Sequence, residues 1–264
     1  MKKKLKSFLI RKNLYYRIRY SRLFRFYQLL FKSGEIKNQK KEIEFYKSFL
    51  PPCALIFDIG AYDGHKTAAF LKIAEKVVSC EPDPESFAIL EARFGKRALV
   101  FLENKALANT VGESHLLIHH PGSAFNTLSP EWRELLENDK GQKWNEKIKF
   151  SNEIVVYTTT LDLLIKKYGR PGFIKIDVEG YEEYVLQGLS QRVPFLSFEG
   201  LWPEGKRAVE KCFERINHLD PAASCNIAAY EKLILPAYIS IGDMLAWLDD
   251  NNVPHFEIIV KMSQ

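Results

Sequence analysis

Residues 55–64 read LIFDIGAYDG, and this stretch decides the fold. An apolar run that ends in an acid predicts a buried strand, and the two glycines predict a tight turn. A helical pattern follows over about residues 65–75, and the next apolar run, residues 77–80, ends in Glu81. This unit suits a ribose-bearing cofactor, because glycines let the backbone approach a ligand and a carboxylate accepts hydrogen bonds from ribose hydroxyls.

Charge divides the chain into a basic start and an acidic remainder. Residues 1–50 hold fifteen Lys and Arg against three Glu, or +12, whereas residues 51–264 hold twenty-three against thirty acids, or −7. With 264 residues, 46% of them hydrophobic, the chain suits one α/β domain that carries an extension. Pro51-Pro52 marks the predicted boundary between the extension and the domain.

Residues 1–33 repeat apolar side chains every three or four positions with Lys and Arg between them, which predicts basic amphipathic helices. Such an extension can pack on the body of the protein, lie on an anionic membrane surface, or contact nucleic acid. No apolar run approaches the roughly 20 residues of a membrane span. The four cysteines lack metal-binding spacing, so we expect a cytoplasmic protein, with peripheral contact at the inner membrane surface as an alternative.

From residue 54 onward predicted strands and helices alternate, which indicates a doubly wound, mostly parallel sheet of seven strands. Two alternating runs, residues 114–119 and 153–159, predict a hairpin or edge pair. Between them lies a polar insertion, about residues 119–153, with a predicted helix over residues 130–138. We expect this insertion to form a lid over the acceptor substrate.

Acids end four of the apolar runs: Asp58, Glu81, Asp177 and Glu199. Ligands of open parallel sheets bind beyond the carboxyl ends of the strands, so we expect these acids around one site. Tyr62 stands where a nicotinamide or flavin fingerprint needs its second glycine, which disfavours an oxidoreductase. The remaining pattern is one that an S-adenosylmethionine site tolerates.

Five segments together resemble the FkbM family of S-adenosylmethionine-dependent methyltransferases. They are residues 57–64 (FDIGAYDG), 81–84 (EPDP), 104–107 (NKAL), 160–162 (TLD) and 175–180 (KIDVEG). The resemblance covers about residues 54–200 and implies a Rossmann-like class I methyltransferase domain over residues 51–264. It also implies O-methylation of hydroxyls on sugars and natural products.

The resemblance implies a role for individual residues toward the cofactor. Glu81 would hold the ribose diol, and Asp177 would lie near the methionine end and the transferring methyl group. The other residues of the implied cofactor site are Asp58, Gly60, Ala61, Asp63, Gly64, Pro82, Asn104 and Ala106.

A hydroxyl acceptor needs alignment with the methyl group and benefits from a general base or a metal ion. The candidate catalytic residues are Asp177, Glu179, Glu199 and His65, although Glu179 could instead cap the following helix. Asp177 and Glu199 could also hold Mg²⁺, which the sequence does not favour.

Aromatic and histidine side chains in the predicted loops have a weaker claim to function. Trp132, Trp144 and Trp202 could stack on a sugar, but packing is the more common role of tryptophan. His119 and His120 point to opposite faces of a strand, which disfavours joint metal ligation.

The sequence thus predicts an O-methyltransferase that acts on a sugar, glycan or related small-molecule acceptor. Two alternatives stay open: a nucleic-acid methyltransferase that uses the basic extension, and a non-catalytic binding module on the same fold. Base methylation typically uses an Asn/Asp-Pro-Pro-aromatic tip, which residues 177–180 lack, so nucleic acid is disfavoured. The sequence does not give the oligomeric state.

Overall fold

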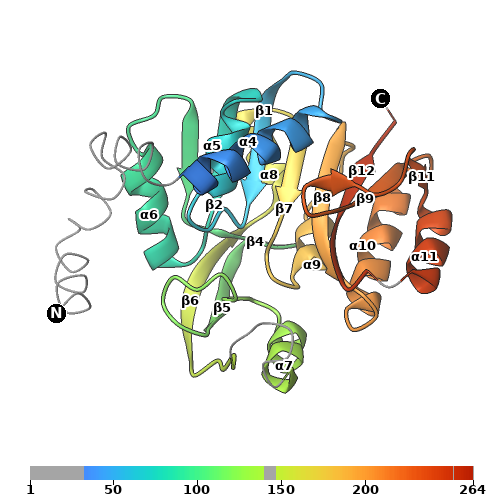
Figure 1. The fold of residues 1–264 in the computed structure, drawn as a ribbon. Helices are drawn as coiled ribbons and strands as arrows, with labels where there is room; N and C mark the ends of the chain where they lie inside the picture. The colour runs from blue at the N-terminus through green and yellow to red at the C-terminus, as the bar shows by residue number, and fades with distance from the viewer. Residues whose placement is uncertain (1–32, 140–146, 252, 264) are drawn as a thin grey trace.

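The computed structural model describes residues 33–139, 147–251 and 253–263 (Figure 1). Residues 1–32, which form most of the predicted basic amphipathic extension of residues 1–50, and Trp144 lie outside the described residues. The helices are α4 (Ser33–Lys47), α5 (His65–Phe70), α6 (Pro84–Phe94), α7 (Pro130–Asn138), α8 (Leu161–Tyr168), α9 (Glu182–Gln187), α10 (Lys206–Leu219) and α11 (Ile241–Asp250).

A large sheet runs through the middle of the molecule in the order β10-β9-β12-β8-β7-β1-β2-β3, with β11 paired to β9. Its strands are β1 (Cys53–Ile59), β2 (Ala74–Cys80), β3 (Val100–Glu103), β7 (Phe173–Ile176), β8 (Phe195–Leu201), β9 (Ser224–Ala229), β10 (Lys232–Leu233), β11 (Ile239–Ser240) and β12 (His255–Lys261). The pairs among β3, β2, β1, β7 and β8 are parallel, and the pairs of β12 are antiparallel. The predicted Rossmann-like fold is confirmed, with β10 and β11 as two-residue additions to seven longer strands.

Side-chain alternation along the strands directs residues to two helical layers. On β1, Phe57 and its alternate neighbours pack in a cluster with side chains of α8, α9, α10 and α11. Ile56 points to the opposite face, where α4 and α5 contribute Tyr46 and Phe70 to a second cluster. Because helices cover both faces, the residues that can reach a ligand are those at the ends of the strands.

A small sheet in the order β4-β6-β5 flanks the insertion, and α7 lies within the insertion (Figure 1). The strands of this sheet are β4 (Ala106–Leu107), β5 (Gly112–Ile118) and β6 (Asn152–Thr159). Strands β5 and β6 pair antiparallel, so the predicted hairpin or edge pair is confirmed. Helix α7 has the predicted bounds because Ser129 caps it, accepting a hydrogen bond from the Trp132 amide, and Pro130 occupies its first position.

Helix α9 begins at Glu182 and its N-cap is Tyr181, so the alternative that Glu179 caps this helix is wrong. Glu179 and Gly180 have φ angles of 56° and 83°, in the left-handed region that an α-helix cannot use. The helix predicted over residues 65–75 ends at Phe70, because β2 already begins at Ala74. None of the helices in the described part of the chain combines the length and apolar character that a membrane crossing requires.

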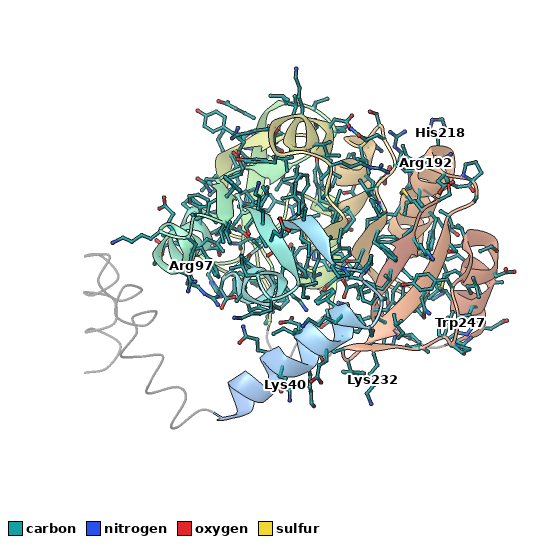
Figure 2. All side chains as sticks on the ribbon, turned by 90° about the horizontal axis from the view of Figure 1, so that it is seen from above. Lys40, Arg97, Arg192, His218, Lys232 and Trp247 are labelled. Atoms are coloured by element: carbon teal, nitrogen blue, oxygen red, sulfur yellow. The ribbon has the colours of Figure 1, made fainter. Side chains whose placement is uncertain are left out.

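Helix α4 packs on the same sheet face as α5. Tyr46 is fully buried against Phe70 and Phe173, with ring centroids 4.9 Å and 5.7 Å from theirs. Lys40 lies on the side of α4 turned away from the sheet, as Figure 2 shows. The last turns of α4 therefore belong to the hydrophobic core.

We expect Tyr46→Ala to lower the free energy of unfolding by about 3–5 kcal/mol, because it empties a fully buried aromatic site. Tyr46→Phe is the matched control. The Tyr46 hydroxyl is buried and has no hydrogen-bond partner among the described residues, so its removal should change stability by less than about 1 kcal/mol or increase it. Urea unfolding of the three proteins measures both effects. Equal losses in both variants would contradict this account of α4.

Candidate active site

A cleft at the carboxyl ends of β1, β2 and β7 is closed on its far side by the insertion. We call it the main cleft. It is lined by Ile59, Gly60, Ala61, Tyr62, His65, Lys66, Cys80, Glu81, Pro82, Lys105, Ala106, Leu107, Leu116, Ser123, Ala124, Asn126, Leu128, Asp177, Val178, Glu179 and Tyr181. The lining combines apolar side chains with charged groups, which suits a ligand that has both an aromatic base and polar groups.

Gly60 brings the loop after β1 against the loop after β7. A Cβ at Gly60 would lie 1.7 Å from the Asp177 carbonyl oxygen, and its φ angle of 79° also favours glycine. A Cβ at Gly64 would collide with Leu90 and Phe94 of α6. The sequence predicts that these glycines admit a ligand, whereas in the structure each makes room for protein atoms.

Glu81 stands at the end of β2 with its carboxylate on the wall of the main cleft. Its two oxygens accept hydrogen bonds of 2.8 Å from the backbone amides of Tyr62 and Asp83. Burial raises the pKa of this carboxyl to about 8. A buried carboxylate held in one orientation beside a cleft can accept further hydrogen bonds from a diol.

Four of the residues predicted for the cofactor site lie beside the main cleft without lining it. The Asp58 carboxylate accepts a 2.5 Å hydrogen bond from Thr67 on α5, because Asp58 shares its sheet face with Ile56. Asn104 donates its side-chain amide to the carbonyl oxygens of Glu81 and Pro82. The Asp63 carboxylate accepts from the His65 amide, and Gly64 contacts α6. Asp58, Asn104 and Asp63 thus hold the loops that form the cleft.

Two non-glycine residues of the main cleft have strained backbones. Tyr62 and Glu179 have φ angles of 49° and 56°, and they lie on the two loops that Gly60 brings together. Backbone strain of this kind clusters at functional sites, where the surrounding contacts hold it in place. Glu179 is held by Trp132, whose ring nitrogen donates to its carboxylate at 3.2 Å, and by Thr127, whose hydroxyl donates to its backbone oxygen at 2.6 Å.

A second cavity adjoins the main cleft and shares Asp177 and Glu179 with it. It is lined by Phe125, Trp132, Asp177, Glu179, Gly180, Glu182, Glu199, Gly200 and His255. A larger outer groove lies between α7 and α10. It shares Trp132, Gly180, Glu199 and Gly200 with this second cavity. The three hollows therefore follow one another, with Asp177 and Glu179 where the first two meet.

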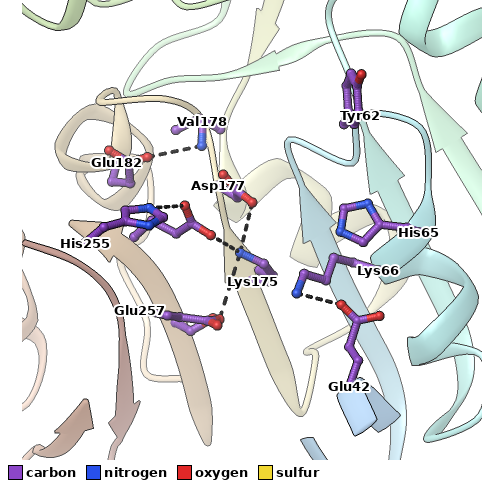
Figure 3. Close-up of polar contacts among 12 residues, drawn as sticks. Glu42, Tyr62, His65, Lys66, Lys175, Asp177, Val178, Glu182, His255 and Glu257 are labelled. Atoms are coloured by element: carbon purple, nitrogen blue, oxygen red, sulfur yellow. Dashed lines mark hydrogen bonds and ion pairs between the residues drawn. The ribbon is translucent and has the colours of Figure 1, made fainter. Parts of the chain in front are cut away.

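Lys175 lies beneath the second cavity among three carboxylates (Figure 3). Its ammonium is 3.1 Å from Asp177, 3.3 Å from Glu199 and 3.9 Å from Glu257, and the side chain is fully buried. Burial opposes its charge, but Asp177 and the other two carboxylates raise the pKa of Lys175 well above its ordinary value. The ammonium lies where the two-carboxylate Mg²⁺ alternative would place the metal ion. Among the described residues, no group of three or more His, Cys, Asp and Glu side chains is arranged to hold a metal.

The pKa values of the carboxylates in this cluster differ. Burial and the Glu199 carboxylate raise the pKa of Asp177 to about 6, although Lys175 counteracts them. Burial alone would raise the pKa of Glu199, but Lys175 and His255 hold it below its ordinary value. Burial and the Asp177 carboxylate raise the pKa of Glu179 well above its ordinary value. Near neutral pH, Asp177 and Glu199 are therefore ionised, and Glu179 holds a proton more readily than an ordinary glutamate does.

Sequence reasoning missed Lys175, Glu257 and His255. The His255 ring lies 3.3 Å from the Glu199 carboxylate, and this hydrogen bond raises the pKa of His255. Strand β12 returns from the end of the chain and pairs Glu257 with Glu199. Local patterns carry no signal for this pairing, although Lys175 inside an apolar strand could have been flagged as a buried charge that needs acids.

Other predicted residues have peripheral positions. His65 lines the main cleft, and its ring lies 3.2 Å from Asp63. His119 and His120 are in contact, with ring centroids 4.8 Å apart, away from the hollows. Trp202 is buried in the core, whereas Trp132 lines the second cavity.

Comparison with known proteins identifies the family of this chain. A family model described as the methyltransferase FkbM domain matches residues 58–221. The chain belongs to the FkbM methyltransferase family. As an FkbM protein it is an S-adenosylmethionine-dependent methyltransferase, which confirms the resemblance that the sequence motifs indicated. The curated proteins include no match to the chain.

Solved methyltransferase structures resemble the FkbM chain at low identity. An rRNA methylase from Streptococcus thermophilus is 13% identical, with 84% of this chain and 94% of that one covered and a TM-score of 0.40. A precorrin-6y C5,15-methyltransferase from Geobacter metallireducens is 10% identical, with 87% and 86% covered and a TM-score of 0.42. At these values the likeness carries no information about the acceptor.

The residues of the main cleft fit the family's cofactor. The Glu81 carboxylate is fixed beside it, apolar side chains such as Pro82 and Ala106 line the same wall, and Asp177 lies at the other end. Positively charged sulfur favours a site with carboxylates near it, and ribose hydroxyls favour a fixed acceptor.

We expect Gly60→Ala to lower the free energy of unfolding by more than about 3 kcal/mol, because the added Cβ would overlap the Asp177 carbonyl and strain the backbone. Gly112→Ala is the matched control, since a Cβ there has no neighbour within 4 Å. It should cost less than about 1 kcal/mol. Urea unfolding compares the two variants, and similar small losses in both would show that the two loops are not locked together.

Glu81 makes stability depend on pH in a defined direction. Between its ordinary pKa of 4.5 and its folded pKa of about 8, the folded protein holds a proton on Glu81 that the unfolded chain has lost. The free energy of unfolding therefore falls as the pH rises through this window. Relative to Glu81→Gln, the wild type should lose about 2 kcal/mol between pH 5.5 and 7.5. The other carboxyl groups titrate in the wild type and in Glu81→Gln alike. Curves of unfolding free energy against pH that run parallel for the two proteins would therefore contradict the raised pKa of Glu81.

Proposed function

We propose that this protein transfers a methyl group from S-adenosylmethionine to a hydroxyl of a sugar, glycan or related acceptor. The observation that carries the proposal is the second cavity, which begins at Asp177 and combines carboxylates with the aromatic side chains of Phe125 and Trp132. Carboxylates accept hydrogen bonds from hydroxyls, and aromatic rings stack on the apolar faces of sugars. This cavity and the outer groove would bind the acceptor.

The charge of the same surfaces argues against a nucleic-acid acceptor. The second cavity is lined by four acids, Asp177, Glu179, Glu182 and Glu199, and by one basic side chain, His255. In the outer groove, Glu131, Glu183 and Glu204 outnumber Arg207 and Lys211. Binding of a phosphate backbone depends on clustered Lys and Arg. A neutral, hydroxyl-rich acceptor fits this lining better than a polyanion.

Asp177 is the residue we propose as the proton acceptor. It lines both hollows, and its pKa of about 6 leaves it ionised and still basic at neutral pH. Glu199 is bound to Lys175 and His255, which makes it a weaker base. The Glu179 side chain already accepts a hydrogen bond from Trp132, so we do not assign it the proton transfer. His65 lines the main cleft but not the second cavity, so we place it with the cofactor.

The reaction needs alignment more than covalent chemistry. When bound, S-adenosylmethionine supplies a methyl carbon on a sulfur that leaves as a neutral thioether. Asp177 would take the hydroxyl proton as the acceptor oxygen bonds to that carbon, so no charge is left on the oxygen. Trp132, through its bond to Glu179, would hold α7 against the site and exclude water.

We propose the following roles for the other residues and segments. Glu81 would bind the ribose diol, with Pro82 and Ala106 beside the adenine. Gly60 and Ala61 would border the methionine and ribose, while Asp58, Asp63, Gly64 and Asn104 would support the loops. Residues 51–264 would form the methyltransferase domain and about 119–153 its lid. The basic residues 1–33 would contact an anionic membrane surface from the cytoplasmic side.

The test is methyl transfer from labelled S-adenosylmethionine to a panel of methyl glycosides, bacterial glycolipid extract and total RNA. We expect label in a carbohydrate fraction, stable to mild alkali as an ether is. Asp177→Asn should lower turnover by about 100-fold or more while cofactor affinity changes little. Glu113→Gln on the exposed part of β5 is the control and should retain full activity.

Three results would contradict the proposal. Label in RNA would favour the nucleic-acid alternative, and label released as methanol by mild alkali would indicate carboxyl methylation. An Asp177→Asn variant with wild-type turnover would remove Asp177 from the chemistry.

A further inference from the structure

The amino-acid part of S-adenosylmethionine carries a negative carboxylate, which the ionised Asp177 of the main cleft would repel. Glu81, Asp177 and Glu179 line the cleft and suit the ribose, the sulfonium and the ammonium of this cofactor. A carboxylate among these acids needs a positively charged partner. Among the described residues that line the cleft, only Lys66 and Lys105 carry a permanent positive charge.

The two lysines lie at different ends of the cleft. Lys105 precedes Ala106, on the wall proposed for the adenine, and its ammonium is 3.8 Å from the Glu103 carboxylate. Lys66 is the second residue of α5, beyond the glycine turn, and its side chain extends toward Lys175 and Asp177 (Figure 3). Its charge contributes to lowering the pKa of Asp177, which lies at the methyl-transfer end. Lys66 is therefore the cation at the amino-acid end.

Helix α4 fixes the position of Lys66 from below. The Lys66 ammonium is 2.6 Å from the Glu42 carboxylate, and the two side chains are only 19% and 9% exposed. The ammonium also lies 5.6 Å from the centre of the Tyr46 ring, in the cation–π range. An ammonium has three donors, so the bond to Glu42 leaves Lys66 able to donate to a second carboxylate.

We propose that Lys66, positioned by Glu42, binds the carboxylate of the amino-acid part of the cofactor. This inference rests on the proposed function, because it assumes S-adenosylmethionine in the main cleft. It makes α4, which precedes the matched FkbM domain, a part of the cofactor site. Glu42 acts through Lys66 and is a positioning residue.

The test compares S-adenosylmethionine with its decarboxylated form, which lacks only the carboxylate, by isothermal titration calorimetry. The wild type should bind S-adenosylmethionine at least tenfold more tightly. Lys66→Met should weaken S-adenosylmethionine binding by about 10- to 100-fold and leave the decarboxylated form within about threefold, because one charge-assisted hydrogen bond is lost. Lys66→Arg keeps the charge and should retain the preference. Lys105→Met is the matched control and should retain it too.

Glu42→Gln tests the positioning role. It should reduce the preference for S-adenosylmethionine by less than Lys66→Met does, and the double variant should be no weaker than Lys66→Met alone. Thermal unfolding of each variant shows that it is folded. Unchanged or tighter S-adenosylmethionine binding in Glu42→Gln would overturn the positioning role.

The outcomes separate the two proposals. A wild type that binds neither ligand would overturn the proposed function, and this inference with it. A wild type that binds S-adenosylmethionine, with equal losses for both ligands in Lys66→Met, would leave the proposed function intact. That result would show that Lys66 serves only to hold α5 against α4 through its ion pair with Glu42.

Discussion

The contact between Gly60 and the Asp177 carbonyl is the constraint on which the site depends. Strands β1 and β7 are neighbours in the sheet, and the loops that follow them touch because residue 60 has no side chain. This contact sets Asp177 at one end of the main cleft. Glu179 and Gly180 follow in a left-handed turn, and α9 begins only after it, at Glu182. The strain of that turn is held by Trp132 and Thr127 from the insertion, so the insertion is tied to the wall of the main cleft.

A second constraint is the electrostatics of the buried charge cluster around Lys175. Lys175 places one positive charge among Asp177, Glu199 and Glu257, and the acids share its effect unequally. Glu199 gains His255 as a second partner, which leaves it firmly ionised, whereas Asp177 keeps a higher pKa and can accept a proton. Removing Lys175 or one of its carboxylates would leave a buried charge without its partner. We therefore expect these side chains to hold one another in fixed positions. The strained Glu179, the basic Asp177 and the paired Glu199 thus differ in role because their surroundings differ.

The sequence predicted those parts of the fold whose signals are local. Helix α7 has the predicted bounds because Ser129 caps its start and Pro130 occupies its first position. The orientation of Asp58 could also have been derived, since alternation places it on the face of Ile56 rather than in the cleft. The left-handed backbone of Glu179 could not, because it arises from contacts with a distant insertion.

The charge cluster was beyond local prediction for a different reason. His255 and Glu257 reach Glu199 only because β12 inserts beside β8 in one register. Similarly, Glu42 meets Lys66 because α4 packs on α5, a tertiary contact that no motif encodes. The FkbM motifs predict where the cofactor binds, whereas these long-range contacts set the charges around that place.

The central claim is that S-adenosylmethionine lies across the ends of β1 and β2 in the main cleft. A crystal structure of the protein with S-adenosylhomocysteine, the demethylated product, tests it directly. The account predicts the ribose hydroxyls within hydrogen-bond distance of the Glu81 carboxylate and the sulfur facing Asp177. A ligand bound elsewhere, or a main cleft that stays empty at saturating ligand, would contradict it.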